Sequence, residues 1–279
     1  MASGVSKLIP SDPDKVMVIR RLTPNLMICS TPFLRFGRVK IGGRGTIVKL
    51  ADGNLAVFSP TALTDNVKKQ MQQQLGSTKV KYLTALDQEH HIFLESWHKA
   101  WPNARIIVPE TLPEYRDKQG YFKLPQSNLV TFKKDTPSSW TVDSAFDAEF
   151  NREYNSAHGN QELVFCHKPT RTLIEADLLF NLPANEQFSR TDTPATSGYA
   201  TRLANSINST TGTALSQKRF IWYTISAGDR KGFNASVARV AKWDFERIVP
   251  CHGDVIESGG KGIFEKVMAW HLEAAKAGS

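Results

Sequence analysis

Cysteine, long apolar runs and clustered basic residues are all scarce in this sequence of 279 residues, and each scarcity excludes a class of protein. The three cysteines, Cys29, Cys166 and Cys251, are too few and too scattered for a disulfide framework or a zinc ribbon, so each is predicted to be a small buried side chain. No stretch approaches the roughly 18 apolar residues of a membrane span, and the first residues lack the apolar core of a secretory signal. We therefore expect a cytoplasmic protein with no membrane partner.

Basic side chains are numerous but dispersed. The formal net charge of +8 suits an anionic ligand, a nucleic acid or simple solubility. Lys and Arg are spread from Lys7 to Lys276, without the arginine-rich arm or the interleaved aromatic and basic residues of a nucleic-acid module. We expect no nucleic-acid partner.

Hydrophobic patterning predicts an α/β protein in which strands alternate with crossing helices. A composition of 41% hydrophobic and 22% charged residues is in the globular range. The β-rich runs, some separated by turn signals such as Asp52-Gly53, cover 16–22, 26–29, 39–41, 46–50, 55–58, 80–84, 106–108, 129–132, 140–142, 146–150, 162–167, 172–174 and 247–250. Helical spacing of apolar residues predicts helices over 64–75, 93–101, 198–207, 214–225, 233–243 and 262–277.

The same patterning predicts the domain organisation. Residues 1–14 are expected to form a flexible lead, because Pro10 and Pro13 oppose regular structure. Residues 15–279 are expected to form a single domain, in which the Ser/Thr-rich region 185–231 is a cap-like insert.

Ionisable residues gather directly beside the predicted strands. Asp87, Glu89, His90 and His91 follow the run 80–84, and functional groups collect beyond the carboxyl ends of strands in open α/β sheets. Three further residues next to strands are His158, Asp177 and His252. Imidazole and carboxylate ligands suit Zn, Fe or Mn, so this set indicates a metal site that needs no cysteine.

The order of these motifs resembles that of the metallo-β-lactamase superfamily. TALDQEHH, SAHGNQELVF, TLIEADLLF and IVPCHG stand where that family has a Thr-His-x-His-x-Asp-His loop, a later His, an Asp after a strand and a closing His-Gly. The resemblance extends from about residue 16 to 275, and is greatest to a branch in which the first motif is eroded. It implies a four-layer αββα sandwich with a helical insert before the last core strand.

The resemblance also implies a set of ligands. Ala85 replaces the first His of the loop and cannot bind a metal. Carried over position by position, the implied ligands are Asp87, Glu89, His90, His158, Asp177 and His252, with Asp177 as the bridging carboxylate. One metal position keeps four ligands and the other only three, so we expect one well-held divalent ion and a second that is weaker or absent. Zn is expected first, with Mn or Fe favoured by the extra carboxylates.

Metal-assisted hydrolysis is the activity that this resemblance implies, on an ester, lactone, thioester or amide of a small molecule. A bound cation lowers the pKa of coordinated water to about 7, and Asp87 would orient that water or act as general base. Because Ala85 removes a ligand, a non-catalytic binding module is the alternative, followed by an oxidoreductase or lyase on the same fold.

The insert is expected to supply the substrate contacts. Aromatic and cationic side chains suit an aromatic or anionic substrate, and the candidates are Tyr199, Tyr223, Arg230 and Lys231. The alternative is that the aromatic residues of 185–231 simply pack the insert onto the core.

Several neighbouring residues have competing interpretations. His91 is the rival of His90 in the loop, and Glu89 alternatively points to solvent; structural roles are expected for His98, His167 and His271. Cys251 and His252 are adjacent, so their side chains would point to opposite sides of an extended chain and form no nucleophilic pair. Residues 42–45, Gly-Gly-Arg-Gly, follow no strand-to-helix junction and are predicted to form a hairpin turn rather than a phosphate loop.

Overall fold

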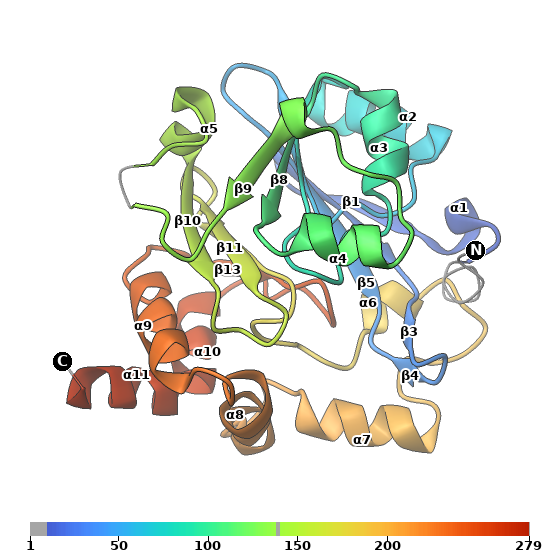
Figure 1. Cartoon of the computed structure of the whole chain (residues 1–279). Coiled ribbons are helices and arrows are strands. Elements are labelled where there is room, and N and C mark those ends of the chain that lie inside the picture. The colour runs from blue at the N-terminus through green and yellow to red at the C-terminus, as the bar shows by residue number, and fades with distance from the viewer. Residues whose placement is uncertain (1–9, 138–139, 279) are drawn as a thin grey trace.

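Two β-sheets lie face to face in the computed structural model, which describes residues 10–137 and 140–278 (Figure 1). The layer between them is apolar and draws side chains from both sheets, among them Ile28 and Ile107 from one and Phe165 and Val249 from the other. Helices pack on the outer face of each sheet and form two further apolar clusters. This is the four-layer αββα arrangement, so the predicted fold class is confirmed. Residues 1–9 of the predicted lead lie outside the described residues.

The larger sheet has seven strands in the order β1-β2-β5-β6-β7-β8-β9. These are β1 Val18–Thr23, β2 Leu26–Thr31, β5 Gly43–Lys49, β6 Leu55–Phe58, β7 Val80–Thr84, β8 Arg105–Pro109 and β9 Leu129–Phe132. β1, β2, β5 and β6 pair antiparallel, whereas β6 to β9 pair parallel. The predicted hairpin at Asp52-Gly53 joins β5 to β6, with Gly53 at a positive φ of 81°. A separate ribbon consists of β3 Leu34–Arg35 and β4 Val39–Lys40.

The smaller sheet has the order β10-β11-β12-β13, and its last two strands are parallel. Its strands are β10 Phe150–Asn155, β11 Glu162–His167, β12 Thr172–Ile174 and β13 Arg247–Val249. The predicted insert 185–231 lies between β12 and β13 in the chain. Because β7, β12 and β13 each belong to parallel pairs, the segments that follow their carboxyl ends are available to form one site.

Helices cover the outer faces of both sheets (Figure 1). The helices of the first half are α1 Pro13–Val16, α2 Asp65–Leu75, α3 Leu94–Ala100, α4 Leu112–Lys118, the 3₁₀ turn η2 Gln126–Asn128 and α5 Ser144–Glu149. Those of the second half are α6 Asn185–Phe188, α7 Tyr199–Ile207, α8 Leu215–Phe220, the π-helical turn η3 Ile221–Ile225, α9 Arg230–Val240, α10 Gly260–Val267 and α11 Ala269–Ala277.

Helix α2 shows why the local sequence predicts these elements well. The Thr64 side chain accepts a hydrogen bond from the Val67 amide at the start, and Gly76 ends the helix at a left-handed φ of 67°. Val67, Met71 and Leu75 are buried on one face, as their four-residue spacing predicts.

Some local predictions are wrong. The predicted strand 146–150 is largely helix α5, because Asp143 caps it by accepting from the Phe146 amide, and 140–142 is not a strand. Gly43, Arg44 and Gly45 begin strand β5 instead of forming a hairpin turn. The predicted helix 262–277 is two helices, α10 and α11, separated at Met268. Pro13 opens the short helix α1, since proline is tolerated in a first turn.

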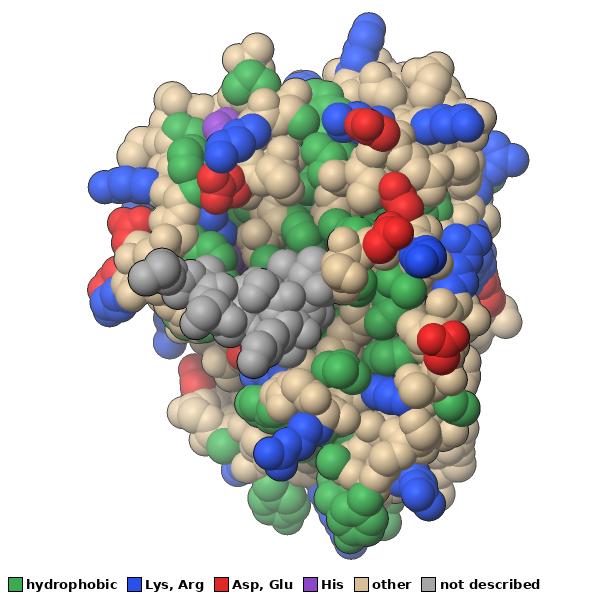
Figure 2. All heavy atoms as spheres, turned by 90° about the vertical axis from the view of Figure 1, so that its right-hand side faces the viewer, with side chains coloured by type: hydrophobic (Ala, Val, Ile, Leu, Met, Phe, Trp, Pro, Cys, Tyr) green, Lys and Arg blue, Asp and Glu red, His purple; other side chains and the backbone are tan. Residues whose placement is uncertain are grey.

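The surface carries its charge in scattered form on the face turned toward the viewer in Figure 2, where Lys and Arg stand singly or in small groups among acidic, polar and apolar side chains. None of the helices in 10–137 and 140–278 combines the length and the apolar character needed to cross a lipid bilayer.

Candidate metal centre

Three potential metal ligands converge from the segments that follow β7, β12 and β13. The Nε2 atoms of His90 and His252 lie 3.1 Å apart, and Asp177 Oδ1 lies 3.1 Å from His252 Nε2. The three ligand atoms are all within 4.8 Å of one another. This spacing is typical of donor atoms that surround a single ion.

The hydrogen-bond partners of the Nδ1 atoms determine the tautomers of the His90 and His252 rings. His252 Nδ1 lies 2.7 Å from the Gly42 carbonyl oxygen, which only accepts, so Nδ1 carries the proton. His90 Nδ1 lies 2.8 Å from Asp87 Oδ1 and donates to that carboxylate in the same way. In the neutral rings, both Nε2 atoms therefore point a lone pair at the other and at Asp177.

Asp177 Oδ1 is a buried carboxylate oxygen that accepts no hydrogen bond from the described residues. Its 3.1 Å approach to His252 Nε2 is not a hydrogen bond if that nitrogen carries no proton. With both rings neutral, two imidazole lone pairs and one carboxylate oxygen face each other in a buried space, and a positive charge among them, a proton on His90 or a metal cation, stabilises this arrangement. The donor set fits a divalent transition metal that accepts both nitrogen and oxygen ligands.

Asp87 shapes the loop that presents His90. Its carboxylate is completely buried, and Oδ1 accepts from the backbone amides of Glu89 at 2.7 Å and His90 at 2.8 Å. This closes a local Asx-type turn and brings the His90 ring back over the same carboxylate. Asp87 therefore fixes the orientation of His90, as a partner behind a metal ligand commonly does.

Asp177 is held by a second set of contacts. The Asn160 side-chain amide donates to Asp177 Oδ2 at 2.6 Å, so Oδ1 is the oxygen turned toward the imidazoles. The buried Glu162 carboxylate accepts from the backbone amides of Ala176 at 2.7 Å and Asp177 at 3.0 Å. Burial, with the carboxylates of Glu175, Asp87 and Asp177 nearby, raises the pKa of Glu162 well above its usual value.

The charges in the site shift the pKa values of His90 and Asp177. Burial alone would lower the pKa of His90, but the carboxylates of Asp87 and Asp177 outweigh it and raise this pKa to about 9. Burial would raise the pKa of Asp177, but the imidazoles of His90, His252 and His158 bring it below its usual value. The site is therefore arranged to hold a positive charge next to a carboxylate.

Two other predicted ligands, Glu89 and His158, do not turn a ligand atom toward the three converging groups. Glu89 forms an ion pair with Arg35 of β3, with one N–O distance of 2.8 Å, and its carboxylate is not in the converging group. His158 Nδ1 accepts from the Asn160 amide at 3.1 Å, and its Nε2 lies 3.3 Å from the Asp177 carbonyl oxygen, so it turns no lone pair toward the centre. Both ring nitrogens of His158 are thus engaged within the fold. The ligand roles assigned from the sequence stay predictions.

A cavity of about 90 Å³ opens beside His90 and His252. Its apolar wall includes Phe33, Ile92 and Phe93, and its polar groups include Arg35 and the buried Arg44; none of the predicted substrate residues Tyr199, Tyr223, Arg230 and Lys231 lines it. Tyr199 is 84% exposed and Tyr223 is 68% exposed. Arg230 stacks on Trp222, with its guanidinium carbon 4.7 Å from the ring centroid.

Sequence reasoning missed the groups that strands β3 to β5 bring to this site. Phe33 and Arg35 lie between the predicted strands 26–29 and 39–41, in a segment to which the sequence assigned no role. Gly42 acts through its backbone carbonyl, which has no residue-type signature. Asn160, which donates to Asp177, could have been predicted from the sequence, because it stands two positions after His158 in the SAHGNQ motif.

The remaining histidines have structural partners or surroundings. His91, the rival of His90, has its Nδ1 atom 2.7 Å from Arg116 Nη1. Burial is the main cause that lowers the pKa of His91 to about 4, and the positive charge of Arg116 is the second. His98 and His271 are buried in helices, and His167 contacts Thr170 and Glu149. All three cysteines are buried, as predicted, and the Cys251 thiol points to the Arg44 carbonyl oxygen at 3.4 Å rather than to His252.

The fold and the three converging ligands define a protein of the metallo-β-lactamase fold, as comparison with solved structures shows. A metallo-β-lactamase from Pontibacter korlensis is 11% identical, with a TM-score of 0.54 over 91% of this chain and 98% of that chain. VMB-1 is 12% identical, with a TM-score of 0.57 over 94% and 99%. A metallo-β-lactamase from Hirschia baltica is 9% identical, with a TM-score of 0.54 over 91% and 97%. Identities this low show the fold alone.

The chain belongs to the family described as "Domain of unknown function (DUF4336)", which matches residues 34–214. The matched region contains His90 and Asp177 and ends before His252. Comparison with curated proteins found no match.

Proposed function

We propose that this protein is a metal-dependent hydrolase that acts on an ester, lactone, thioester or amide bond of a small molecule, with one principal metal ion. The observation that carries the proposal is the convergence of His90, His252 and Asp177, whose ligand atoms lie within 4.8 Å of one another and include the unpartnered Asp177 Oδ1. A centre with three protein ligands keeps coordination positions open for water and substrate, as catalytic metal sites do.

When bound, a divalent ion supplies Lewis acidity, which polarises a carbonyl group and acidifies water. The chain's own residues prepare the site for it. Asp87 and the Gly42 carbonyl hold the two imidazoles with Nε2 turned inward, and Asn160 fixes the Asp177 carboxylate. Such preorganisation removes the need to reorient ligands during the reaction.

Asp87 is better placed to position His90 than to take a proton from water. Its carboxylate is completely buried and already accepts from two backbone amides and one imidazole. A general base must reach the proton that it abstracts, and this carboxylate is enclosed by its own loop. The role that we propose for it is to orient His90.

The cavity indicates a small substrate. Its volume of about 90 Å³ accommodates an acyl group of a few heavy atoms, and Phe33, Ile92 and Phe93 give it an apolar wall that excludes water. Arg35, paired with Glu89 and 38% exposed at its side chain, provides a cation beside the same space. A substrate that carries a carboxylate could replace Glu89 as the ion-pair partner of Arg35.

Elemental analysis of purified protein, followed by a screen of acyl substrates, tests this function. We expect close to one equivalent of Zn, Mn or Fe per chain, lost in His90→Ala and His252→Ala and retained in His98→Gln, a matched histidine control outside the centre. Metal-dependent hydrolysis should disappear with the metal. A protein that binds no metal after metal-replete expression would be a binding module instead, and redox-active iron without acyl hydrolysis would indicate an oxidoreductase.

A further inference from the structure

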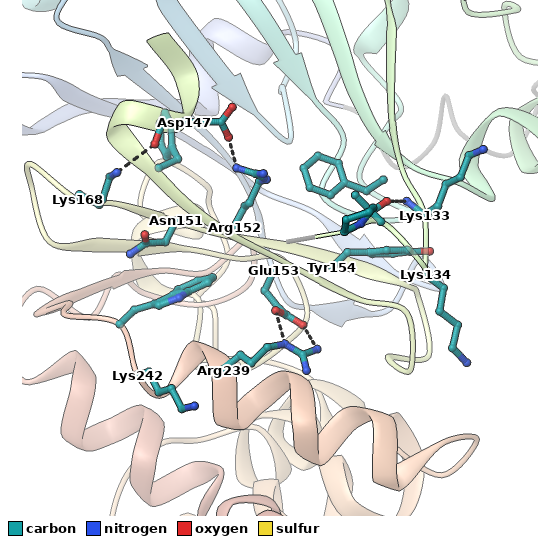
Figure 3. Close-up of a pocket in the computed structure, with 15 residues that line it drawn as sticks. Lys133, Lys134, Asp147, Asn151, Arg152, Glu153, Tyr154, Lys168, Arg239 and Lys242 are labelled. Carbon is teal, nitrogen blue, oxygen red and sulfur yellow. Dashed lines mark hydrogen bonds and ion pairs between the residues drawn. The ribbon is translucent and has the colours of Figure 1, made fainter. Parts of the chain in front are cut away.

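A groove of about 750 Å³ runs along the edges of both sheets, between the end of β9, strand β10 and helix α9 (Figure 3). β9 and β10 are the outermost strands of their sheets, so the groove lies where the two sheets come together at an edge. It shares no lining residue with the cavity at the metal centre.

The lining of this groove is strongly cationic. Its acidic side chains are Asp147 and Glu153, against six basic ones: Lys133, Lys134, Arg152, Lys168, Arg239 and Lys242. Both carboxylates are already paired, Asp147 with Arg152 and Glu153 with Arg239, the latter through two contacts of 2.8 and 2.5 Å. The two ion pairs cancel their charges, so the four lysines give the groove its positive potential.

The lysines stand at both ends of the groove. Figure 3 shows Lys133 and Lys134 at one end and Lys168 and Lys242 at the other, with the Glu153–Arg239 pair between them. Within the described residues, the side chains of Lys133 and Lys242 make no hydrogen bond or ion pair, and Lys134 has only Asp229 at 3.8 Å. An anion in the groove would lie between ammonium groups from both ends, and their positive potential favours its binding.

The floor and walls of the groove are well fixed. Arg152 and Glu153 belong to β10, which pairs along its length with β11, and Arg239 belongs to α9. Tyr154 and Trp243 add half-buried aromatic surface, and the Tyr154 hydroxyl is anchored 3.2 Å from Gln161 Oε1. A ligand would meet a rigid base with exposed lysine side chains around it.

We propose that this groove binds a small molecule that carries several phosphate groups. Lysine ammonium groups act as point charges that suit phosphate, and their placement at both ends fits a ligand with anionic groups distributed along its length. The volume matches that of pockets for small molecules. A long nucleic acid fits less well, because the groove has the volume of a small-molecule pocket and its lysines stand at its two ends instead of along a continuous track. This inference is independent of the proposed hydrolase activity.

Calorimetric titration of the intact protein with sodium tripolyphosphate tests the proposal. We expect saturable binding of one tripolyphosphate per chain, weakened about tenfold or more in the double variant Lys133→Gln/Lys242→Gln. Both side chains are exposed and make no hydrogen bond or ion pair within the described residues, so the variant should fold normally, which circular dichroism checks. The double variant Lys69→Gln/Lys79→Gln is the matched control, because it removes the same charge from exposed lysines outside the groove.

Three results would overturn the inference. Equal weakening in both double variants would show a general charge effect, and loss of tripolyphosphate binding in His252→Ala would place the phosphate at the metal centre. Binding of a single-stranded oligonucleotide without any binding of tripolyphosphate would make the groove a nucleic-acid site. Retention of binding in His252→Ala and in the control variant supports it.

Discussion

His90 Nε2 and His252 Nε2 lie 3.1 Å apart although 162 positions separate these residues in the chain. A hydrogen bond donated by Nδ1 fixes the orientation of each ring. His90 donates to the Asp87 carboxylate, and His252 donates to the Gly42 carbonyl oxygen. The contact therefore brings together two basic nitrogens and the free oxygen of Asp177, and several predictions depend on a cation occupying the point where they meet.

Removal of the metal should destabilise the wild-type protein but not the variant His252→Ala. A ligand present at about 100 times its dissociation constant stabilises the folded state by about 2.7 kcal/mol. We expect a chelator such as EDTA to lower the Tm of the wild type and to leave the Tm of the variant unchanged, as followed by thermal melts. Equal shifts in the two proteins would show that the chelator acts elsewhere.

Asp87→Asn should weaken metal binding without abolishing it. The amide oxygen of asparagine still accepts from His90 Nδ1, but without the negative charge that strengthens the imidazole as a ligand. Loss of a partner behind a metal ligand typically costs about 10- to 100-fold in affinity. Competition with a coloured chelator measures the change. A complete loss of metal, as in His90→Ala, would mean that Asp87 is itself a ligand, as the sequence predicted.

Glu89→Gln should leave the metal content unchanged. The Glu89 carboxylate pairs with Arg35 and does not join His90, Asp177 and His252. The pair is partly exposed, so its loss should have little effect on stability. Elemental analysis distinguishes this from the family-derived expectation, under which Glu89→Gln would lose metal in the same way as His90→Ala.

Gly253→Ala should disturb the centre through the backbone. Gly253 has a φ of 89°, and a Cβ there would meet the Asn181 carbonyl oxygen at 2.1 Å, so the segment carrying His252 has to move. We expect lower metal affinity together with lower stability. Gly53→Ala is the control, because Gly53 also has a positive φ, of 81°, but a Cβ there meets nothing within 4 Å. That variant should lose about 1 kcal/mol of stability and keep its metal.

Phe165→Ala should destabilise the fold by about 3–5 kcal/mol, since this fully buried ring packs between the two sheets and its removal leaves a cavity. Urea denaturation measures the change. The matched control is Tyr223→Ala, a ring that is 68% exposed and should change stability by about 0.5 kcal/mol or less. Similar losses in the two variants would show that the inter-sheet layer is not the principal core.

The sequence by itself determined most of the elements and the fold class. Apolar spacing and end signals place helix α2 between Thr64 and Gly76, and the runs at 80–84 and 162–167 agree with β7 and β11. These signals are local, because a helix or strand buries residues that are close together in the chain. They failed at 146–150, where the Asp143 cap turned a β-like run into helix α5. The motif order also pointed to His90, Asp177 and His252, which do converge.

Only the tertiary structure decided which candidates face the centre. Glu89 turns to Arg35, both nitrogens of His158 are occupied by the backbone, and Gly42 contributes only a carbonyl oxygen. These choices depend on rotamers and on partners from distant strands, and no local periodicity records them. A pattern of residue types can name the side chains that are able to bind a metal, but long-range packing determines where their lone pairs point.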